Sequence, residues 1–107
     1  MLHIFCCLSL ERCRVAGTAG SWRYFKIVLP PGQSTLDVTI VGPNIGDADL
    51  YIRYGALPTL SAWNARPYLV GNIERARGVG LPPGEYYIGL NAFEDYSFVT
   101  LQATTSP

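Results

Sequence analysis

The stretch TLDVTIVGPNIGDADLYIRY, residues 35–54, is typical of two β-strands joined by a turn. Its first seven residues alternate apolar and polar side chains, which is the period of a strand that buries one face. The middle, GPNIGD, is rich in residues that tolerate positive φ or begin Asx turns. The remainder, ADLYIRY, is apolar enough to form a second strand. We therefore expect Leu36, Val38 and Ile40 to face a core.

Similar alternation recurs along the chain in SWRYFKIVL (21–29), EYYIGLNAF (85–93) and SFVTLQA (97–103). Clusters of Pro and Gly end these segments, and no segment holds a helical period. In the first segment, Arg23 and Lys26 are assigned to the solvent side. The tetrapeptide FEDY, residues 93–96, predicts a hairpin turn between the last two segments. The sequence therefore predicts an all-β chain, an antiparallel β-sandwich of jelly-roll-like form.

The composition indicates a single packed domain. The chain has 107 residues, of which 49% are hydrophobic and 12% aromatic. Eight basic and eight acidic residues cancel, and the bases form no run. A nucleic-acid binder normally carries a basic surplus or stripe, so we expect no nucleic-acid partner. No apolar stretch is long enough to cross a bilayer, and we expect a monomer without a membrane span.

The first seventeen residues differ in character from the rest. They contain all three cysteines, Cys6, Cys7 and Cys13, an odd and clustered set that does not form a disulfide framework. The opening MLHIFCCLSL has the apolar core of a signal peptide but lacks the basic segment before it, so it is not a convincing signal peptide. We expect a poorly ordered tail over residues 1–17, one reading of which is a signal remnant, the sandwich over 18–104, and a C-terminal tail over 105–107.

The sequence argues against an enzyme. Catalysis by a Ser-His-Asp or Cys-His arrangement needs a histidine, and the only histidine, His3, lies in the predicted tail. Patterns for phosphate-binding loops are absent. A minimal hydrolase built on two carboxylates is the weaker alternative, because so small a sandwich would struggle to enclose a substrate cleft.

Two aspartates at the start of ADLYIRY are the candidate metal ligands. Asp47 and Asp49 are two residues apart in an extended segment, so their carboxylates point to the same side and repel unless something neutralises them. In one interpretation they fix the turn with Asn44 and Gly46, and one of them pairs with an arginine such as Arg53 or Arg66. In the alternative, calcium binds between them. No cofactor is certain, and calcium is the one considered.

Aromatic residues outside the predicted core are the candidate binding residues. Strand alternation places Tyr51 and Tyr87 on the side opposite to the apolar face of their strands, and Trp63 and Tyr68 lie in a long connection. Tyr and Trp combine a large contact area with a polar tip, which suits recognition of protein or sugar surfaces. The competing interpretation is a second buried layer of aromatic side chains.

Four blocks in order carry a family resemblance: GSWRYFKIVLPPGQSTLDVTI, GDADLYIRYGALPT, WNARPYLVGNIERA and PPGEYYIGLNAFEDYSFVTLQA. Together they cover roughly residues 18–104, and they resemble the bacterial pre-peptidase C-terminal domain, which is related to the collagen-binding domains of collagenases. The resemblance implies a non-catalytic sandwich appended to secreted peptidases, which aids secretion, stability or attachment to insoluble protein or polysaccharide. It also implies an extracellular location, a peptidase domain as a partner, and calcium in some relatives.

One departure from the family pattern concerns a loop. Close relatives have a pair of cysteines where this chain has Ala65 and Ala76, and an aspartate where it has Asn64. A bridge closing a loop of about a dozen residues would stabilise the fold by roughly 3 kcal/mol, so its absence either loosens the loop over residues 60–78 or reflects a reducing compartment. A stand-alone protein-interaction domain, unconnected with a peptidase, is the alternative to the accessory role.

Overall fold

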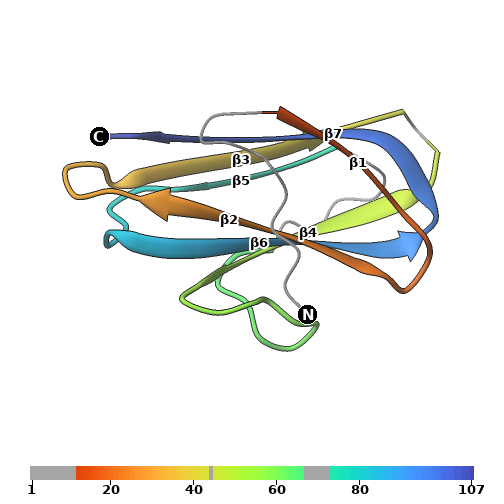
Figure 1. Ribbon diagram of the computed structural model, residues 1–107, viewed down its shortest axis with the longest axis horizontal. Coiled ribbons are helices and arrows are strands. Elements are labelled where there is room, and N and C mark those ends of the chain that lie inside the picture. The colour runs from red at the N-terminus through yellow and green to blue at the C-terminus, as the bar shows by residue number, and fades with distance from the viewer. Residues whose placement is uncertain (1–11, 44, 67–72) are drawn as a thin grey trace.

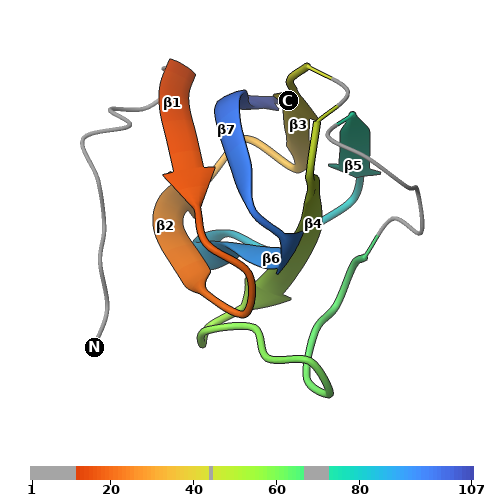
Figure 2. The ribbon, with the colours of Figure 1, turned by 90° about the vertical axis from the view of Figure 1, so that its right-hand side faces the viewer.

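The computed structural model describes residues 12–43, 45–66 and 73–107, and these form two antiparallel sheets packed face to face (Figures 1 and 2). One sheet has four strands in the order β1-β7-β3-β5 and the other has three in the order β2-β6-β4. The described residues contain no helix. The strands are β1 (Arg12–Gly17), β2 (Trp22–Leu29), β3 (Thr35–Val41), β4 (Asp47–Tyr54), β5 (Glu74–Gly78), β6 (Gly84–Glu94) and β7 (Tyr96–Ser106). The predicted all-β sandwich is confirmed.

The core lies between the sheets, where the alternation predicted it. Leu36, Val38 and Ile40 of β3 are at most 2% exposed, as are Leu50 of β4 and Leu90 of β6. Burying each such side chain stabilises the fold by roughly 1.5–3 kcal/mol. The inner faces of the two sheets therefore form one continuous core.

Every connection between consecutive strands crosses from one sheet to the other. The predicted hairpin at residues 93–96 is therefore wrong: β6 and β7 belong to different sheets, and the chain turns at Asp95 from one to the other (Figure 1). The physical reason is that both strands bury an alternating apolar face in the same core. Alternation alone cannot distinguish a hairpin within one sheet from a corner between two.

The ends of the folded region lie outside the predicted boundaries. Residues 12–17, which were assigned to the tail, form β1 and pair with β7, and Val15 is 2% exposed opposite Val99. The C-terminal strand likewise continues to Ser106. A six-residue strand with few apolar side chains has too weak a pattern to be recognised, and its backbone pairing with β7 supplies the missing stabilisation. Residues 1–11, including Cys6 and Cys7, lie outside the described residues.

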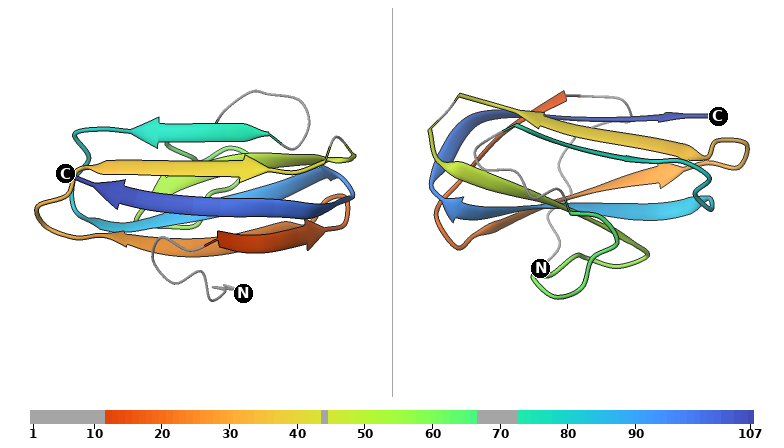
Figure 3. Two further views of the ribbon diagram at one scale, coloured as in Figure 1. Left: turned by 90° about the horizontal axis from the view of Figure 1, so that it is seen from above. Right: turned by 180° about the vertical axis from the view of Figure 1, so that it is seen from behind.

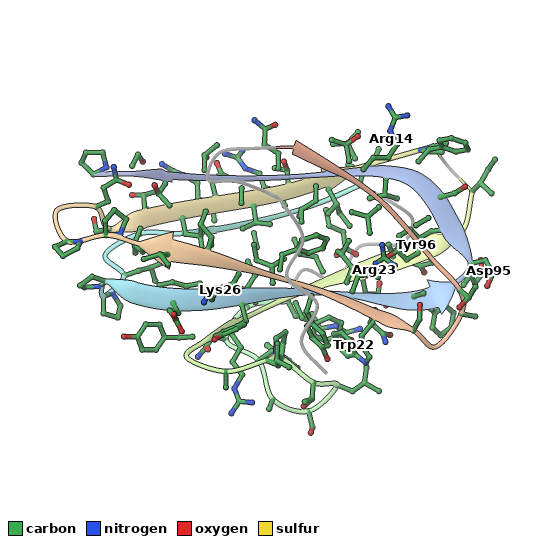
Figure 4. All side chains as sticks on the ribbon, in the orientation of Figure 1. Arg14, Trp22, Arg23, Lys26, Asp95 and Tyr96 are labelled. Atoms are coloured by element: carbon green, nitrogen blue, oxygen red, sulfur yellow. The ribbon has the colours of Figure 1, made fainter. Side chains whose placement is uncertain are left out.

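Arg23 also differs from the prediction, because its position in β2 has the parity of the core residues Phe25 and Ile27. Figure 4 shows Arg23 and Tyr96 between the two sheets, close to one end of the sandwich. Burial raises the pKa of Tyr96 to about 12, and the positive charge of Arg23 opposes that rise. The open end of the sandwich allows an arginine at a position that would otherwise require an apolar side chain.

Candidate functional site: the edge and outer face of strand β4

Strand β4 lies at the edge of the three-stranded sheet. The backbone amides on its free side donate hydrogen bonds to other parts of the chain. An unpaired strand edge is a template for pairing with another chain, so proteins usually cover or interrupt it. The amides of Leu50, Ile52 and Tyr54 donate respectively to Glu74 Oε1 (2.8 Å), the Ala65 carbonyl (2.9 Å) and Asn64 Oδ1 (2.8 Å). These contacts close the edge and fix the connection that follows β4.

Glu74 is an acidic side chain in a buried position. It is 1% exposed, and while its Oε1 accepts the Leu50 amide, its Oε2 has no hydrogen-bond partner among the described residues. Burial, together with the charges of Asp49 and Asp47, raises the pKa of Glu74 to about 8, although the hydrogen bond from the Leu50 amide acts in the opposite direction. Glu74 is therefore mostly protonated at neutral pH, a state in which the buried oxygen carries no charge.

The predicted aspartate pair lies on the outer face of β4, because Ala48 and Leu50 point into the core. Burial raises the pKa of Asp49 to about 6, the charge of Asp47 adds to the rise, and Arg66 opposes it. The Arg66 Nη2 lies 3.8 Å from Asp49 Oδ2, which is the arginine pairing that the turn interpretation expected. Asp47 Oδ1 is buried and has no hydrogen-bond partner among the described residues.

Gly46 shapes the turn that leads into β4. Its φ is 85°, a conformation that L side chains rarely adopt. A Cβ at this position would also collide with the backbone carbonyl of Asp95, at the corner between β6 and β7. Glycine is thus required both by the conformation and by the close approach. Asn44, the other predicted turn residue, lies outside the described residues.

The carboxylates only partly fit a metal site. Within residues 12–43, 45–66 and 73–107, no three His, Cys, Asp or Glu side chains are grouped so that they could hold a metal ion. The unpartnered Oδ1 of Asp47 is an oxygen that a cation could use. Calcium takes six to eight oxygens, so a calcium site here would draw most of its ligands from backbone carbonyls and water.

The outer face of β4 is covered by the connection over residues 55–66. Tyr51 points away from the core between the sheets yet is only 1% exposed. The ring of Trp22 lies 5.0 Å from that of Tyr51, and the guanidinium carbon of Arg66 lies 4.7 Å above the Tyr51 ring. Trp22 also stacks on Tyr24, with 5.3 Å between ring centroids. Tyr51 is therefore part of a second buried layer, the competing interpretation, and is closed to a ligand.

This second layer depends on a glycine in the central strand of the three-stranded sheet, which has no side chain on the outer face. Gly89 of β6 lies opposite both Tyr24 and Tyr51, and a Cβ there would meet Trp22 and Pro58 at 2.9 Å. Pro58 is fully buried, and its carbonyl accepts the hydroxyl of Tyr24 at 3.1 Å. The missing side chain at Gly89 makes room for the connection to pack on the sheet.

The remaining predicted binding residues are dispersed. Trp63 and Tyr87 are half-buried, and the Tyr87 hydroxyl donates to Glu85 Oε1 at 3.1 Å. Tyr68 lies outside the described residues. Sequence reasoning did not select Glu74 as a site residue; it is the glutamate of the block WNARPYLVGNIERA, and that block was the signal that could have identified it.

The described segments contain no helix with the length and hydropathy that a membrane crossing requires.

Comparisons with known proteins identify the family. The model of the bacterial pre-peptidase C-terminal domain matches residues 23–92. The chain is 38% identical over 89 residues to alkaline serine exoprotease A of Vibrio alginolyticus. This alignment covers 83% of the chain and 16% of that protein. The chain is also 35% identical over 86 residues to the virulence metalloprotease of Vibrio anguillarum. This second alignment covers 80% of the chain and 14% of that protein. The chain thus spans about a seventh of the length of these relatives.

A solved structure agrees on the fold. The pre-peptidase C-terminal domain of a collagenase from Bacillus anthracis superposes with a TM-score of 0.66, over 92% of this chain and 90% of that one, at 10% identity. The chain belongs to the bacterial pre-peptidase C-terminal domain family.

Proposed function

We propose that this chain is a non-catalytic accessory module of secreted peptidases, which aids their secretion, stability or attachment to insoluble protein or polysaccharide. The observation that supports the proposal is the pair of relatives, one named a serine protease and the other a metalloprotease. These two classes use different catalytic groups, yet both align with this chain over a similar small share of their length. A segment common to both cannot carry the catalytic residues of either. By the same resemblance we propose an extracellular location.

The attachment role rests on aromatic side chains that keep part of their surface accessible. Trp63 and Tyr87 are the two described members of the predicted binding set that do so. Tyr51 acts beneath the surface, where it holds Trp22 and Arg66 in place. We propose Trp63 and Tyr87 as contacts to an uncharged or protein polymer.

A pull-down on insoluble collagen and chitin tests this role. We expect purified chain to be retained on at least one of the two, and the Trp63→Ala/Tyr87→Ala double variant to be retained less. Val28→Ala is the control, because Val28 is an exposed apolar residue on β2 of the three-stranded sheet, outside the proposed contacts. No retention on either polymer would contradict the attachment role. Peptidase turnover by the pure chain would contradict the non-catalytic assignment.

For the aspartate pair, we propose that Asp47 and Asp49 fix the start of β4, with calcium as the alternative. Asp47 Oδ1, which is buried and has no hydrogen-bond partner within the described part of the chain, is what keeps calcium in consideration. Under the first proposal, Asp47→Ala changes the melting temperature equally in calcium and in chelator. A melting temperature that rises by several degrees with calcium, and loses this response in Asp47→Ala, would establish the metal instead.

A further inference from the structure

The part of the chain that the structure describes leaves the outer face of the four-stranded sheet uncovered (Figure 3). Figure 3 (left) looks down on this face, and no described segment crosses it. Its outward side chains alternate with the core residues of the same strands, so Thr39 stands between Val38 and Ile40 and Gln102 between Leu101 and Ala103. Among the described segments, none covers this face as residues 55–66 cover Tyr51 on the other sheet.

Register places these outward positions in rows across the strands. One row runs Arg12, Gln102, Thr39, Arg75 and spans all four strands, and the next runs Thr104, Asp37, Arg77. With neighbouring strands about 4.8 Å apart, the first row is about 14 Å long. Along these two rows the middle strands β7 and β3 carry Gln102, Thr39, Thr104 and Asp37, and the edge strand β5 carries Arg75 and Arg77.

The charge of this face is positive. Arg75 makes a forked contact with Asp37, with Nε–Oδ1 at 3.0 Å and Nη2–Oδ2 at 2.5 Å, and the Arg77 Nε lies 3.9 Å from the same carboxylate. The side chains of Arg75 and Arg77 are 61% and 56% exposed. Arg14 of β1 is also exposed on this face (Figure 4). The described side chains of this face thus carry three positive charges and one negative charge, although the whole chain is neutral.

The Asp37 carboxylate also orients the arginines. The hydrogen bond from Arg75 lowers the pKa of Asp37, so the carboxylate stays ionised and the fork stays formed at neutral pH. A guanidinium held in this way loses less conformational freedom when it binds an anion, and its remaining N–H groups suit a carboxylate or sulfate.

These features together point to one class of partner. We propose that the outer face of the four-stranded sheet binds an acidic polysaccharide, with its carboxylates or sulfates against Arg14, Arg75 and Arg77 and its hydroxyls against Thr39 and Gln102. The inference rests on the proposed attachment role. It adds the class of polymer that is bound and a second surface, besides Trp63 and Tyr87, that binds it. Binding of duplex nucleic acid would need more closely spaced basic side chains than this face offers. A stable protein partner would need a central, deeply buried anchor, whereas the rows through Thr39 and Asp37 are polar and the exposed apolar residues Val41 and Phe98 lie toward one end of the face.

Retention on alginate beads and on heparin beads, with uncharged agarose as the blank, tests the proposal. We expect the chain to be retained on both kinds of bead at low salt and to be eluted by added salt. In the Arg75→Gln/Arg77→Gln variant, the Kd for each polysaccharide should rise about tenfold or more, because hydrogen bonds to charged groups are lost. The matched control is Lys26→Gln/Arg53→Gln, which removes the same charge from the other sheet and should leave Kd within about twofold. Melting curves of both variants check that each is folded.

Each other outcome overturns the proposal. Absence of retention, retention that salt does not weaken, or an equal loss in both double variants would show that this face is not the site. Equal affinity for polyglutamate would show that the face recognises charge without recognising sugar. Retention on collagen or chitin that depends on Trp63, without binding to alginate or heparin, would leave the attachment role intact and remove only this inference.

Discussion

The outer faces of the two sheets begin from the same strand alternation but differ in what covers them. On the three-stranded sheet, residues 55–66 fold back over the outward side chain of Tyr51, which becomes as buried as a core residue. On the four-stranded sheet, no described segment crosses the outer face (Figure 3). An outward position in a strand is therefore not necessarily an exposed one, and of the two outer faces only that of the four-stranded sheet is left uncovered by the described connections.

The largest expected effect is the loss of Tyr51. If the covered face is a second core, Tyr51→Ala should lower the free energy of unfolding by roughly 3–4 kcal/mol, because it removes a buried ring that Trp22 and Arg66 contact. In a domain of this size the melting temperature should fall by more than about 10 °C. Tyr87→Ala, an outward tyrosine that is only half-buried, is the control and should cost less than about 1 kcal/mol. Equal losses in the two variants, measured by urea unfolding, would erase the distinction between covered and open outward positions.

The next effect is a pH dependence that originates at the covered edge. The folded pKa of Glu74, about 8, lies above its ordinary value of 4.5. The stability that protonated Glu74 allows is therefore fully present below about pH 4.5 and is lost as the pH rises through 8. Asp49, with a pKa of about 6, has the same sign over a narrower window. The free energy of unfolding should accordingly fall by a few kcal/mol between pH 5 and pH 8.

Glu74→Gln separates this effect from others. The amide keeps an oxygen for the Leu50 N–H but does not titrate, so most of the slope between pH 5 and pH 8 should disappear. Urea unfolding at several pH values measures it. A wild-type curve that rises over this range, or a variant curve with an unchanged slope, would show that Glu74 is ionised at little cost in the folded state.

The smallest expected effect is at Asn64. Its Oδ1 accepts the Tyr54 amide at the exposed end of β4, so Asn64→Ala should lower stability by about 1 kcal/mol. Asn64→Asp keeps an acceptor oxygen and should stay close to the wild type. If the aspartate variant lost as much as the alanine variant, the hydrogen bond would not be the source of the stability.

The sequence predicted the core better than its surroundings. Period-two alternation identified Val38, Ile40 and Leu90, because burial on one face leaves a direct trace in the residue pattern. It failed at the 93–96 corner and at β1, where pairing between distant segments decides the structure. These contacts have no local signature.

The candidate site shows the same limit. The resemblance predicted the loop block and the family, and the Asp49–Arg66 pairing was among the interpretations. The role of Glu74 depends on its position beside an edge amide 24 residues earlier in the chain. The burial of Tyr51 depends on the absence of a side chain at Gly89, which lies on a different strand.

An NMR titration of labelled chain with an alginate oligosaccharide tests the difference between the two outer faces most directly. Backbone and side-chain shifts should change at Thr39, Arg75 and Gln102, with little change at Leu50, Tyr51 or Ile52, and added salt should reverse them. Changes centred on the covered face, or none at all at millimolar oligosaccharide, would contradict the assignment of the outer face of the four-stranded sheet as the surface for an acidic polysaccharide.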